Sequence, residues 1–267
     1  MSNIEKKNPI VLSIAGSDSS GGAGIQADIK TITTHGCYAA TTITCVTSQN
    51  SHGIFDIVPI PTSNIISQIE TTLQDYEVDA IKIGMVYDSD IIGAIVEVLK
   101  DTDIPIVIDP VMVASSSQSL TQQKAIDSMK KKLLPLATII TPNIPEAKIL
   151  LGSRWVENLK VNAWNLARDF GCNVLLKTGH LSRIEDILVE VQTETLSLFA
   201  FNKLETTNTH GTGCTLSAAI ASEIAKGNPL KEAVNLSTKY IHELLKASMN
   251  MGDHIFNGPM YHCIVNG

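Results

Sequence analysis

Apolar positions along the chain follow two alternating patterns. Short runs rich in Ile, Val and Thr alternate with longer stretches in which apolar residues recur at helical spacing, as expected for buried strands and amphipathic helices. The predicted strands are 11–15, 41–46, 80–83, 104–108, 138–141, 173–177 and 195–201. The predicted helices are 24–34, 64–75, 89–100, 121–133, 145–151, 161–170, 215–226 and 230–249. This alternation predicts an α/β fold: a central, mostly parallel sheet with helices on both faces.

The chain is predicted to form one domain over residues 1–267. No low-complexity linker or internal repeat divides it, and α/β folds of about 250 residues are often single units. The runs 80–83 and 104–108 are expected to be strands covered on both faces. The segment 182–208 is polar and strand-rich, which leaves two interpretations open: a flap over a site, or an ordinary surface hairpin.

Composition narrows the class of protein. The formal net charge is -7, which argues against nucleic acid or an anionic membrane as the main partner. The five cysteines form no C-x-x-C pair, so neither a structural zinc site nor a disulfide framework is expected. The N-terminal residues lack the apolar core of a signal peptide, and no apolar run approaches the ~18 residues of a membrane span. We therefore expect a cytoplasmic protein.

A glycine-rich segment, 209–215 (THGTGCT), precedes an Ala-rich amphipathic run. Glycines allow close backbone approach, and the free N–H groups of a helix start attract anions, so this segment predicts an anion hole. Cys214 would lie at that helix start, where the dipole favours the thiolate and lowers the thiol pKa below ~8.5. The alternative is a glycine-rich turn with a small buried cysteine.

A second glycine-rich segment, 15–24 (AGSDSSGGAG), follows the first predicted strand. It also fits the loose dinucleotide pattern G-x-G-x-x-G/A, but the acidic residue expected ~20 positions later is missing, because Asp56 is the first acid after Asp28. A Walker-type G-x-x-x-x-G-K-[ST] motif is absent from the sequence. A dinucleotide oxidoreductase is therefore a weak alternative.

Charged residues follow three further predicted strands. Asp109 ends 104–108, Glu146 begins a helix after 138–141, and Lys177 ends 173–177. The carboxyl ends of parallel strands share one crevice, where two carboxylates could hold Mg²⁺ together with phosphates. Glu146 could instead be a helix N-terminal acid and Lys177 a solvated lysine. His180 and His210 are interpreted as structural hydrogen-bonding residues.

Together these motifs resemble the hydroxymethylpyrimidine/phosphomethylpyrimidine kinase family of the ribokinase-like superfamily. The resemblance covers residues 10–241, nearly the whole chain, with a shorter echo at 257–262. It includes Cys214, where the wider superfamily usually has aspartate. The matching segments are 15–28, 47–50, 82–85, 109–112, 141–147, 177–180 and 209–215.

The resemblance implies a three-layer α/β/α kinase domain, commonly a homodimer, that uses ATP and Mg²⁺ in thiamin biosynthesis. The implied substrates are 4-amino-5-hydroxymethyl-2-methylpyrimidine and its monophosphate. Carried over by position, Gln49, Gly16, Ala23, Asp28 and Met85 contact the pyrimidine. Lys177, Asn143 and Thr209 contact nucleotide phosphates, and Glu146 and Asp109 organise the metal. Gly211, Thr212 and Gly213 form the anion hole, with Cys214 as the catalytic base beside the attacking hydroxyl.

Two departures from the family pattern concern ATP affinity. Ser115–Ser117 replace a usual Ser-Gly pair, and Thr178 stands where the family usually has glycine. Two other functions also remain open. A pyridoxal kinase would share the fold, although Gln49 and Met85 favour a pyrimidine. A non-catalytic pyrimidine-binding module would not need Asp109, Glu146 and Cys214 together.

Overall fold

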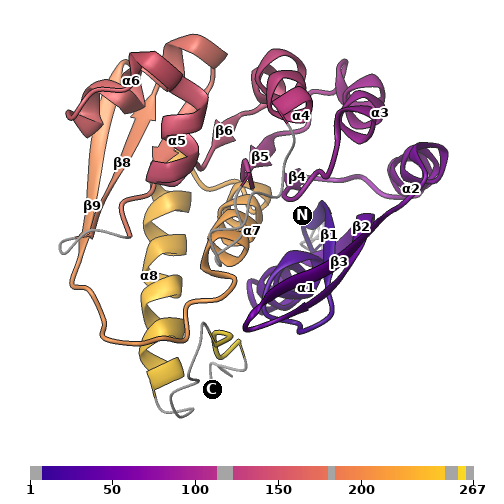
Figure 1. Ribbon diagram of the computed structural model, residues 1–267, viewed down its shortest axis with the longest axis horizontal. Coiled ribbons are helices and arrows are strands. Elements are labelled where there is room, and N and C mark those ends of the chain that lie inside the picture. Colours follow the sequence, from indigo (N-terminus) through magenta and orange to yellow (C-terminus); the bar gives the residue numbers. More distant parts are fainter. Residues whose placement is uncertain (1–7, 113–122, 180–183, 250–257, 263–267) are drawn as a thin grey trace, which may run out of the picture.

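One nine-stranded sheet organises the protein (Figure 1). The computed structural model describes residues 8–112, 123–179, 184–249 and 258–262. The strands stand in the order β3-β2-β1-β4-β5-β6-β7-β8-β9. Their bounds are β1 Ile10–Asp18, β2 Tyr38–Asn50, β3 Gly53–Pro59, β4 Ala80–Ile83, β5 Ile106–Ile108, β6 Ile139–Ile140, β7 Asn173–Leu176, β8 Ile184–Glu190 and β9 Thr195–Phe201.

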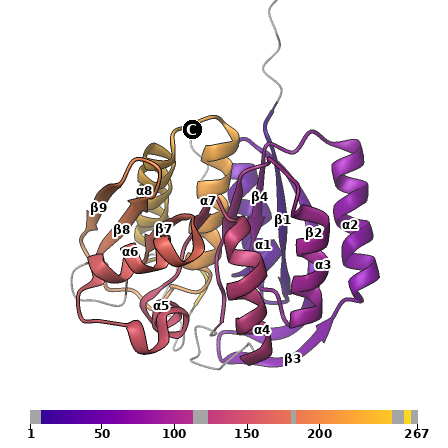
Figure 2. The same ribbon diagram turned by 90° about the horizontal axis from the view of Figure 1, so that it is seen from above.

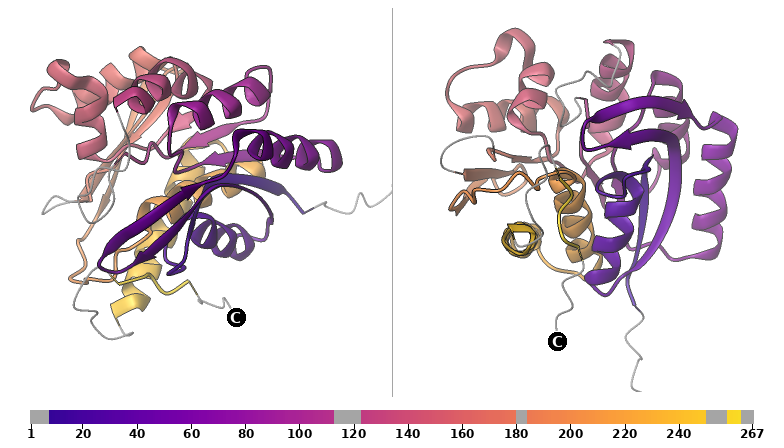
Figure 3. Two further views of the ribbon diagram at one scale, coloured as in Figure 1. Left: turned by 45° about the vertical axis from the view of Figure 1, so that its right-hand side comes forward. Right: turned by 60° about the horizontal axis from the view of Figure 1, so that its bottom comes forward.

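The six central strands, from β2 to β7, run parallel, and antiparallel pairs close both edges. The N-terminal strands form one side of the sheet and the C-terminal strands the other (Figure 2). The β2–β3 pair forms a long ribbon that reaches past the other strands (Figure 3). Because the central strands are parallel, their carboxyl ends meet at one edge.

Helices cover both faces of the sheet (Figure 1). One apolar core lies between the sheet and α2 to α6, and a second lies between the sheet and α1, α7 and α8. The helices are α1 Gly24–Thr34, α2 Thr62–Asp75, α3 Ser89–Leu99, α4 Gln123–Ser128, α5 Ile144–Leu151, α6 Leu159–Phe170, α7 Thr212–Ala225 and α8 Leu230–Ser248. Short turns of other helix types cover Met129–Leu133, Leu134–Leu136 and Gly152–Arg154.

The predicted α/β architecture is confirmed, with corrections at the sheet edges. β3 was not predicted, because it is an edge strand without a fully buried residue and so lacks an apolar face. Segment 182–208 contributes β8 and β9, which form a hairpin that extends the main sheet. Its apolar residues Leu188 and Val189 are fully buried, so the hairpin is part of the core and not a flap.

Three smaller points concern the ends of elements. α7 begins three residues before the predicted start at Thr215, and α4 is shorter than predicted and continues into a π turn. Ser115–Ser117 and His180 lie outside the described residues. Within the described part of the chain, none of the helices combines the length and apolarity needed to cross a bilayer.

Candidate active site

Five of the predicted site residues lie near the carboxyl edge of the parallel strands. Each follows or ends a different strand, and the N-terminus of α7 approaches the same edge, packed against β1, β4 and β5. A backbone bridge joins the loops after β6 and β7 directly. The contributing residues are Gln49 near the end of β2, Met85 after β4, Asp109 after β5, Asn143 after β6 and Lys177 after β7.

Asp109 and Lys177 form an ion pair at the centre of this edge. Lys177 Nζ lies 2.8 Å from Asp109 Oδ1, and Thr141 Oγ1 donates to the same oxygen at 3.2 Å. Burial disfavours the ammonium, but Asp109 and Glu146 outweigh it and raise the pKa of Lys177. A Cβ built on Gly213 would lie 3.0 Å from Asp109 Oδ2 and 3.3 Å from Lys177 Nζ. Glycine thus brings the α7 backbone directly against this pair.

Glu146 and Asn143 form a capping box at the start of α5. Asn143 Oδ1 accepts from the Glu146 N–H at 2.9 Å, and Glu146 Oε2 accepts from the Asn143 N–H at 2.8 Å. Both side chains therefore have the helix-cap role that was the alternative interpretation for Glu146. Burial raises the pKa of Glu146 to about 7, although Lys177 opposes this.

The acids at this edge were predicted to hold a magnesium ion together with phosphates. Among the described residues, no group of three or more His, Cys, Asp or Glu side chains could hold a metal by itself. Asp109 is neutralised by Lys177, and Glu146 is engaged in its cap. Mg²⁺ in nucleotide sites usually takes one or two carboxylates plus phosphates and water. The donor set fits that arrangement and not a resident metal centre.

The N-terminus of α7 has the features of the predicted anion hole. Gly211 is its N-cap residue, with φ of 87°, and no side chain caps the first turn. The Thr212 N–H donates to the Thr209 carbonyl at 3.3 Å, so the N–H groups that follow it in the first turn are the candidate donors for an anion. A Cβ on Gly211 would lie 1.8 Å from the Gly22 carbonyl oxygen, so only glycine allows the two glycine-rich segments to meet. Thr209 is exposed just before this turn.

Cys214 lies in the first turn of α7, as predicted, but the predicted lowering of its pKa is wrong. Burial raises the pKa of its thiol to about 11, and this outweighs the opposing effects of Lys82 and of a hydrogen bond with Gly24. The helix dipole supports a thiolate at a solvated helix start. Here desolvation dominates, so the thiol carries its proton at neutral pH before ligands bind.

Asp28 does not line the pocket, contrary to the prediction. Its side chain is fully buried on α1, and both carboxylate oxygens accept from Lys82 Nζ at 2.8 and 2.9 Å. Ser13 Oγ donates to the same carboxylate at 2.6 Å. Although burial disfavours the ammonium, Asp28 raises the pKa of Lys82. The pair is therefore fully enclosed between α1 and the sheet.

The other predicted pyrimidine-contacting residues are placed near one another. A Cβ on Gly16 would lie 3.5 Å from Met85 Sδ and 2.8 Å from Cys45 Sγ. Ala23 is the N-cap residue of α1. Gln49 lies near the end of β2, 3.4 Å from the His210 ring. Ala23, Met85 and Gln49 are partly exposed, as side chains that contact a ligand need to be, whereas Gly16 is buried.

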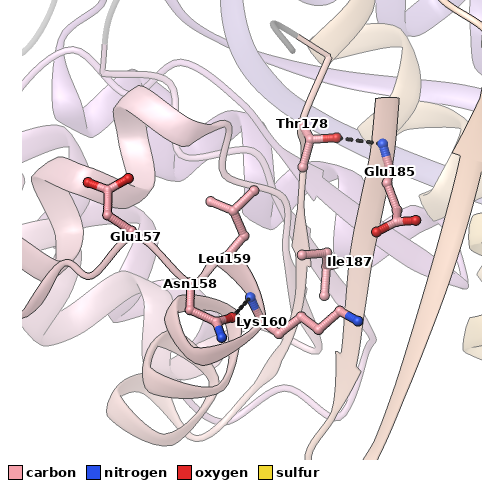
Figure 4. A pocket seen from close by; sticks show the side chains of 7 residues that line it. All are labelled: Glu157, Asn158, Leu159, Lys160, Thr178, Glu185 and Ile187. Atoms are coloured by element: carbon pink, nitrogen blue, oxygen red, sulfur yellow. Dashed lines mark hydrogen bonds between the residues drawn. The ribbon is translucent and has the colours of Figure 1, made fainter. Parts of the chain in front are cut away.

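A separate pocket lies beside this edge, between the start of α6 and strand β8 (Figure 4). Thr178 lines it and accepts from the Glu185 N–H at 2.7 Å. None of the predicted site residues contributes to its wall. The lining residues are Glu157, Asn158, Leu159, Lys160, Thr178, Glu185 and Ile187.

Lys82 and Asp18 have clear structural importance but were not given a role from sequence, and the partner of His210 was not predicted. Lys82 lies within the run 80–83, predicted to be a strand covered on both faces, and a charged residue inside such a strand was the available signal. Asp18 and His210 connect the two glycine-rich segments, with His210 Nε2 2.9 Å from Asp18 Oδ2. The sequence suggested a hydrogen-bonding role for His210 but not its partner.

The fold and the glycine-lined, lysine-containing edge define a ribokinase-like protein. Residues 18–260 match the family model described as phosphomethylpyrimidine kinase, and the chain belongs to this family. The hydroxymethylpyrimidine/phosphomethylpyrimidine kinase of Haemophilus influenzae is 40% identical over 272 residues, covering 98% of both chains.

Solved structures agree with this assignment. The phosphomethylpyrimidine kinase of Clostridium difficile 630 is 41% identical, with a TM-score of 0.78, covering 88% of this chain and 99% of that one. The pyridoxal kinase of Bacillus subtilis, solved as an ADP complex, is 32% identical, with a TM-score of 0.80, covering 96% and 97%. The family thus has structural relatives among pyridoxal kinases.

Proposed function

We propose that this protein transfers a phosphoryl group from ATP to the hydroxymethyl group of 4-amino-5-hydroxymethyl-2-methylpyrimidine. A second ATP then phosphorylates the monophosphate to the diphosphate, in thiamin biosynthesis. Family membership supports this proposal, because near-full-length relatives at 40% identity carry the same activity in their names.

One structural observation carries the proposal. The uncapped start of α7 lies directly against the Asp109–Lys177 pair through Gly213. Phosphoryl transfer depends mainly on positioning and on neutralising the charge that spreads over the phosphoryl oxygens. Free N–H groups and a lysine ammonium at one point supply this neutralisation. On this proposal Lys177 contacts the ATP phosphates, and Asn143 and Thr209 lie along the nucleotide path.

Magnesium is proposed to accompany ATP. Asp109 and Glu146 would hold it, directly or through water, and the ion would neutralise phosphate charge during transfer. Asp109 would have to exchange part of its contact with Lys177, and Lys177 would be freed to face phosphate. The partial exposure of Lys177, 13% of its side chain, is compatible with such an exchange.

Cys214 is proposed to take the proton from the substrate hydroxyl in the first step. Because its thiol is protonated at rest, it must first release that proton to water when the ligands bind. Nearby positive charge from Lys82 favours the thiolate. The second step uses a phosphate oxygen that is already ionised near neutral pH, so it needs no base.

The test is Mg-ATP turnover with the hydroxymethylpyrimidine, followed by ³¹P NMR, with pyridoxal assayed in parallel. Successive appearance of the pyrimidine monophosphate and diphosphate is the expected result. Phosphorylation of pyridoxal alone would assign the protein to vitamin B6 salvage instead. Binding of the pyrimidine without ADP formation would indicate a non-catalytic binding module.

Pyridoxal kinase is the second candidate because the Bacillus subtilis pyridoxal kinase covers nearly the whole chain. Its identity is lower, 32% against 41% for the Clostridium difficile relative. Pyridoxal also carries a hydroxymethyl group on a nitrogen ring, so the phosphorylated group would be the same. The parallel assay separates the two.

We also propose a homodimer that uses the β2–β3 ribbon. This ribbon exposes Val46, Phe55 and Val58 to 45%, 70% and 56%, and Val46 pairs with Val58 across the two strands. Exposed apolar side chains on an edge strand and its neighbour favour association. Light scattering should give the mass of a dimer, and a monomer mass would contradict this proposal. The cytoplasmic location stays a prediction.

A further inference from the structure

Asp18 is the centre of a dense hydrogen-bond network between the two glycine-rich segments. Oδ2 accepts from the N–H groups of Gly22 and Ala23 at 3.1 and 2.8 Å and lies 2.9 Å from His210 Nε2. Oδ1 accepts from the N–H and hydroxyl of Ser20, both at 2.8 Å. Burial opposes the charge, but the hydrogen bonds from His210, Ser20 and Ala23 outweigh it and lower the pKa of Asp18 to about 2.

An ionised carboxylate accepts hydrogen bonds and cannot donate them. His210 Nε2 must therefore carry a proton and donate it to Asp18, whether the ring is neutral or charged. Gln49 Nε2 lies 3.4 Å from the same ring nitrogen. With the amide in this orientation, an NH₂ group faces an N–H group, and no hydrogen bond is possible.

The other end of the Gln49 amide has the complementary mismatch. Thr47 Oγ1 lies 3.3 Å from Gln49 Oε1, but Thr47 already donates its only hydroxyl proton to the Ser17 carbonyl at 2.8 Å. Two acceptors therefore face each other. Amide oxygen and nitrogen positions are assigned from the hydrogen-bond network. Rotating the amide by half a turn converts both mismatches into hydrogen bonds.

We propose that His210, held by Asp18, and Thr47 are positioning residues that fix the Gln49 amide with its carbonyl toward His210 and its NH₂ toward Thr47. The carbonyl then shares the His210 proton, and the NH₂ donates to Thr47. Each amide atom keeps one further hydrogen-bonding position, an acceptor on Oε1 and a donor on Nε2. Gln49 therefore presents an acceptor and a donor in a fixed order.

This order selects a class of ring. A 4-aminopyrimidine carries an amine donor next to a ring-nitrogen acceptor, which is complementary to an amide edge. The 4-oxo analogue carries an oxygen acceptor next to an N–H donor, the reverse order. For a ring held in one pose, a fixed amide favours one of the two rings, which on the proposed function is the amino ring, whereas an amide free to rotate would accept both. This expected preference for the amino ring rests on the proposed function.

The structural part is tested on the wild-type protein without substrate. In ¹⁵N-labelled protein, NOEs from the Gln49 Nε2 protons should reach Thr47 and not the His210 ring protons. NOEs to the His210 ring alone would overturn the proposed orientation, whatever the substrate is.

The functional part compares His210→Leu with His210→Gln, which keeps an N–H donor for Asp18. We measure binding by calorimetry and Mg-ATP turnover for 5-hydroxymethyl-2-methylpyrimidines with a 4-amino or a 4-oxo group. In wild type the amino ring should be preferred by on the order of 100-fold in kcat/KM, because the wrong ring leaves polar groups unpaired. His210→Leu should reduce this preference to roughly 10-fold or less, mainly through KM, and His210→Gln should restore most of it.

Two controls show whether His210 acts through Gln49. In a Gln49→Ala background, His210→Leu should change the preference no further. His242→Leu removes a histidine that stacks on Phe201 instead and should leave the preference unchanged. An unchanged amino/oxo preference in His210→Leu, with both rings equally weakened, would overturn the positioning role. Failure of wild type to bind or phosphorylate either ring would instead refute the proposed function and leave the NOE result to decide the orientation.

Discussion

Two aspartate–lysine pairs lie near the start of α7, and they differ in accessibility. In both, lysine Nζ is 2.8 Å from a carboxylate oxygen. The Asp28 and Lys82 side chains are 0% exposed, whereas Lys177, paired with Asp109, keeps 13%. The same chemistry therefore has two consequences. The fully buried pair stabilises the fold and contributes to the local electrostatic potential. In the accessible pair, the lysine can exchange its carboxylate partner for phosphate.

The difference arises from what surrounds each pair. Asp28 also accepts from Ser13, a neighbour of Lys82 across the β1–β4 pairing. This leaves the pair no access to solvent or ligand. The Asp109–Lys177 pair faces the backbone at Gly213, where an added Cβ would lie 3.0 Å from Asp109 Oδ2 and 3.3 Å from Lys177 Nζ and would crowd the pair. The glycine at position 213 thus distinguishes the Asp109–Lys177 pair, which a ligand can approach, from the structural Asp28–Lys82 pair.

The largest expected effect tests the accessible pair. Lys177→Met should lower kcat by about 10²–10³-fold, because a positive charge is lost where phosphoryl charge develops. The free energy of unfolding should change much less, since Asp109 can gain water or Mg²⁺. Steady-state kinetics and urea unfolding measure the two quantities. A large loss of stability with nearly normal kcat would assign this pair to the fold instead.

The fully buried pair should show the opposite profile. Lys82→Met should lower the free energy of unfolding by about 3–5 kcal/mol, because it leaves a buried carboxylate without its counter-charge. Replacing both partners, Asp28→Leu with Lys82→Met, should recover most of that loss, since well-packed apolar pairs often substitute for buried ion pairs. Urea unfolding of the three proteins checks this. A double variant as unstable as the single one would contradict the argument.

The comparison also explains which predictions from sequence succeeded. The positions of Asp109, Glu146 and Lys177 at strand ends were predictable, because parallel topology brings the carboxyl ends of strands to one edge. That Asp28 faces Lys82 and not a ligand depends on how α1 packs against β4. Local patterns do not determine such packing.

Cys214 shows that local sequence patterns also fail to determine the pKa of a side chain. Its place in the first turn of α7 followed from the glycine-rich segment before the Ala-rich run. The sign of its pKa shift did not follow, because the dipole argument contains no measure of desolvation. The amide of Gln49 is a third case, since its orientation depends on proton positions at His210 and Thr47 that only the assembled network determines.

The charges of both pairs act on Cys214, so its substitution tests the reactive group that lies between them. Cys214→Ala should slow the first phosphorylation about 100-fold, because the alcohol loses its base. The second phosphorylation should change by less than about 3-fold, since its phosphate nucleophile is already ionised. Single-turnover assays on each substrate measure the two steps separately. Equal losses in both steps would favour a packing or anion-hole role for this side chain.

The smallest effect concerns the resting thiol. With a pKa of about 11, Cys214 should react slowly with iodoacetamide at pH 7.5, and the rate should rise about tenfold per pH unit up to pH 10, following the thiolate fraction. Within the fully buried pair, Lys82 lowers the pKa of this thiol and Asp28 raises it. Asp28→Asn should therefore shift the alkylation profile to lower pH. Peptide mass spectrometry resolves Cys214 from the buried Cys37, Cys45 and Cys172. Rapid alkylation at neutral pH, independent of pH, would mean that the thiolate is already present and that the helix dipole outweighs burial at this position.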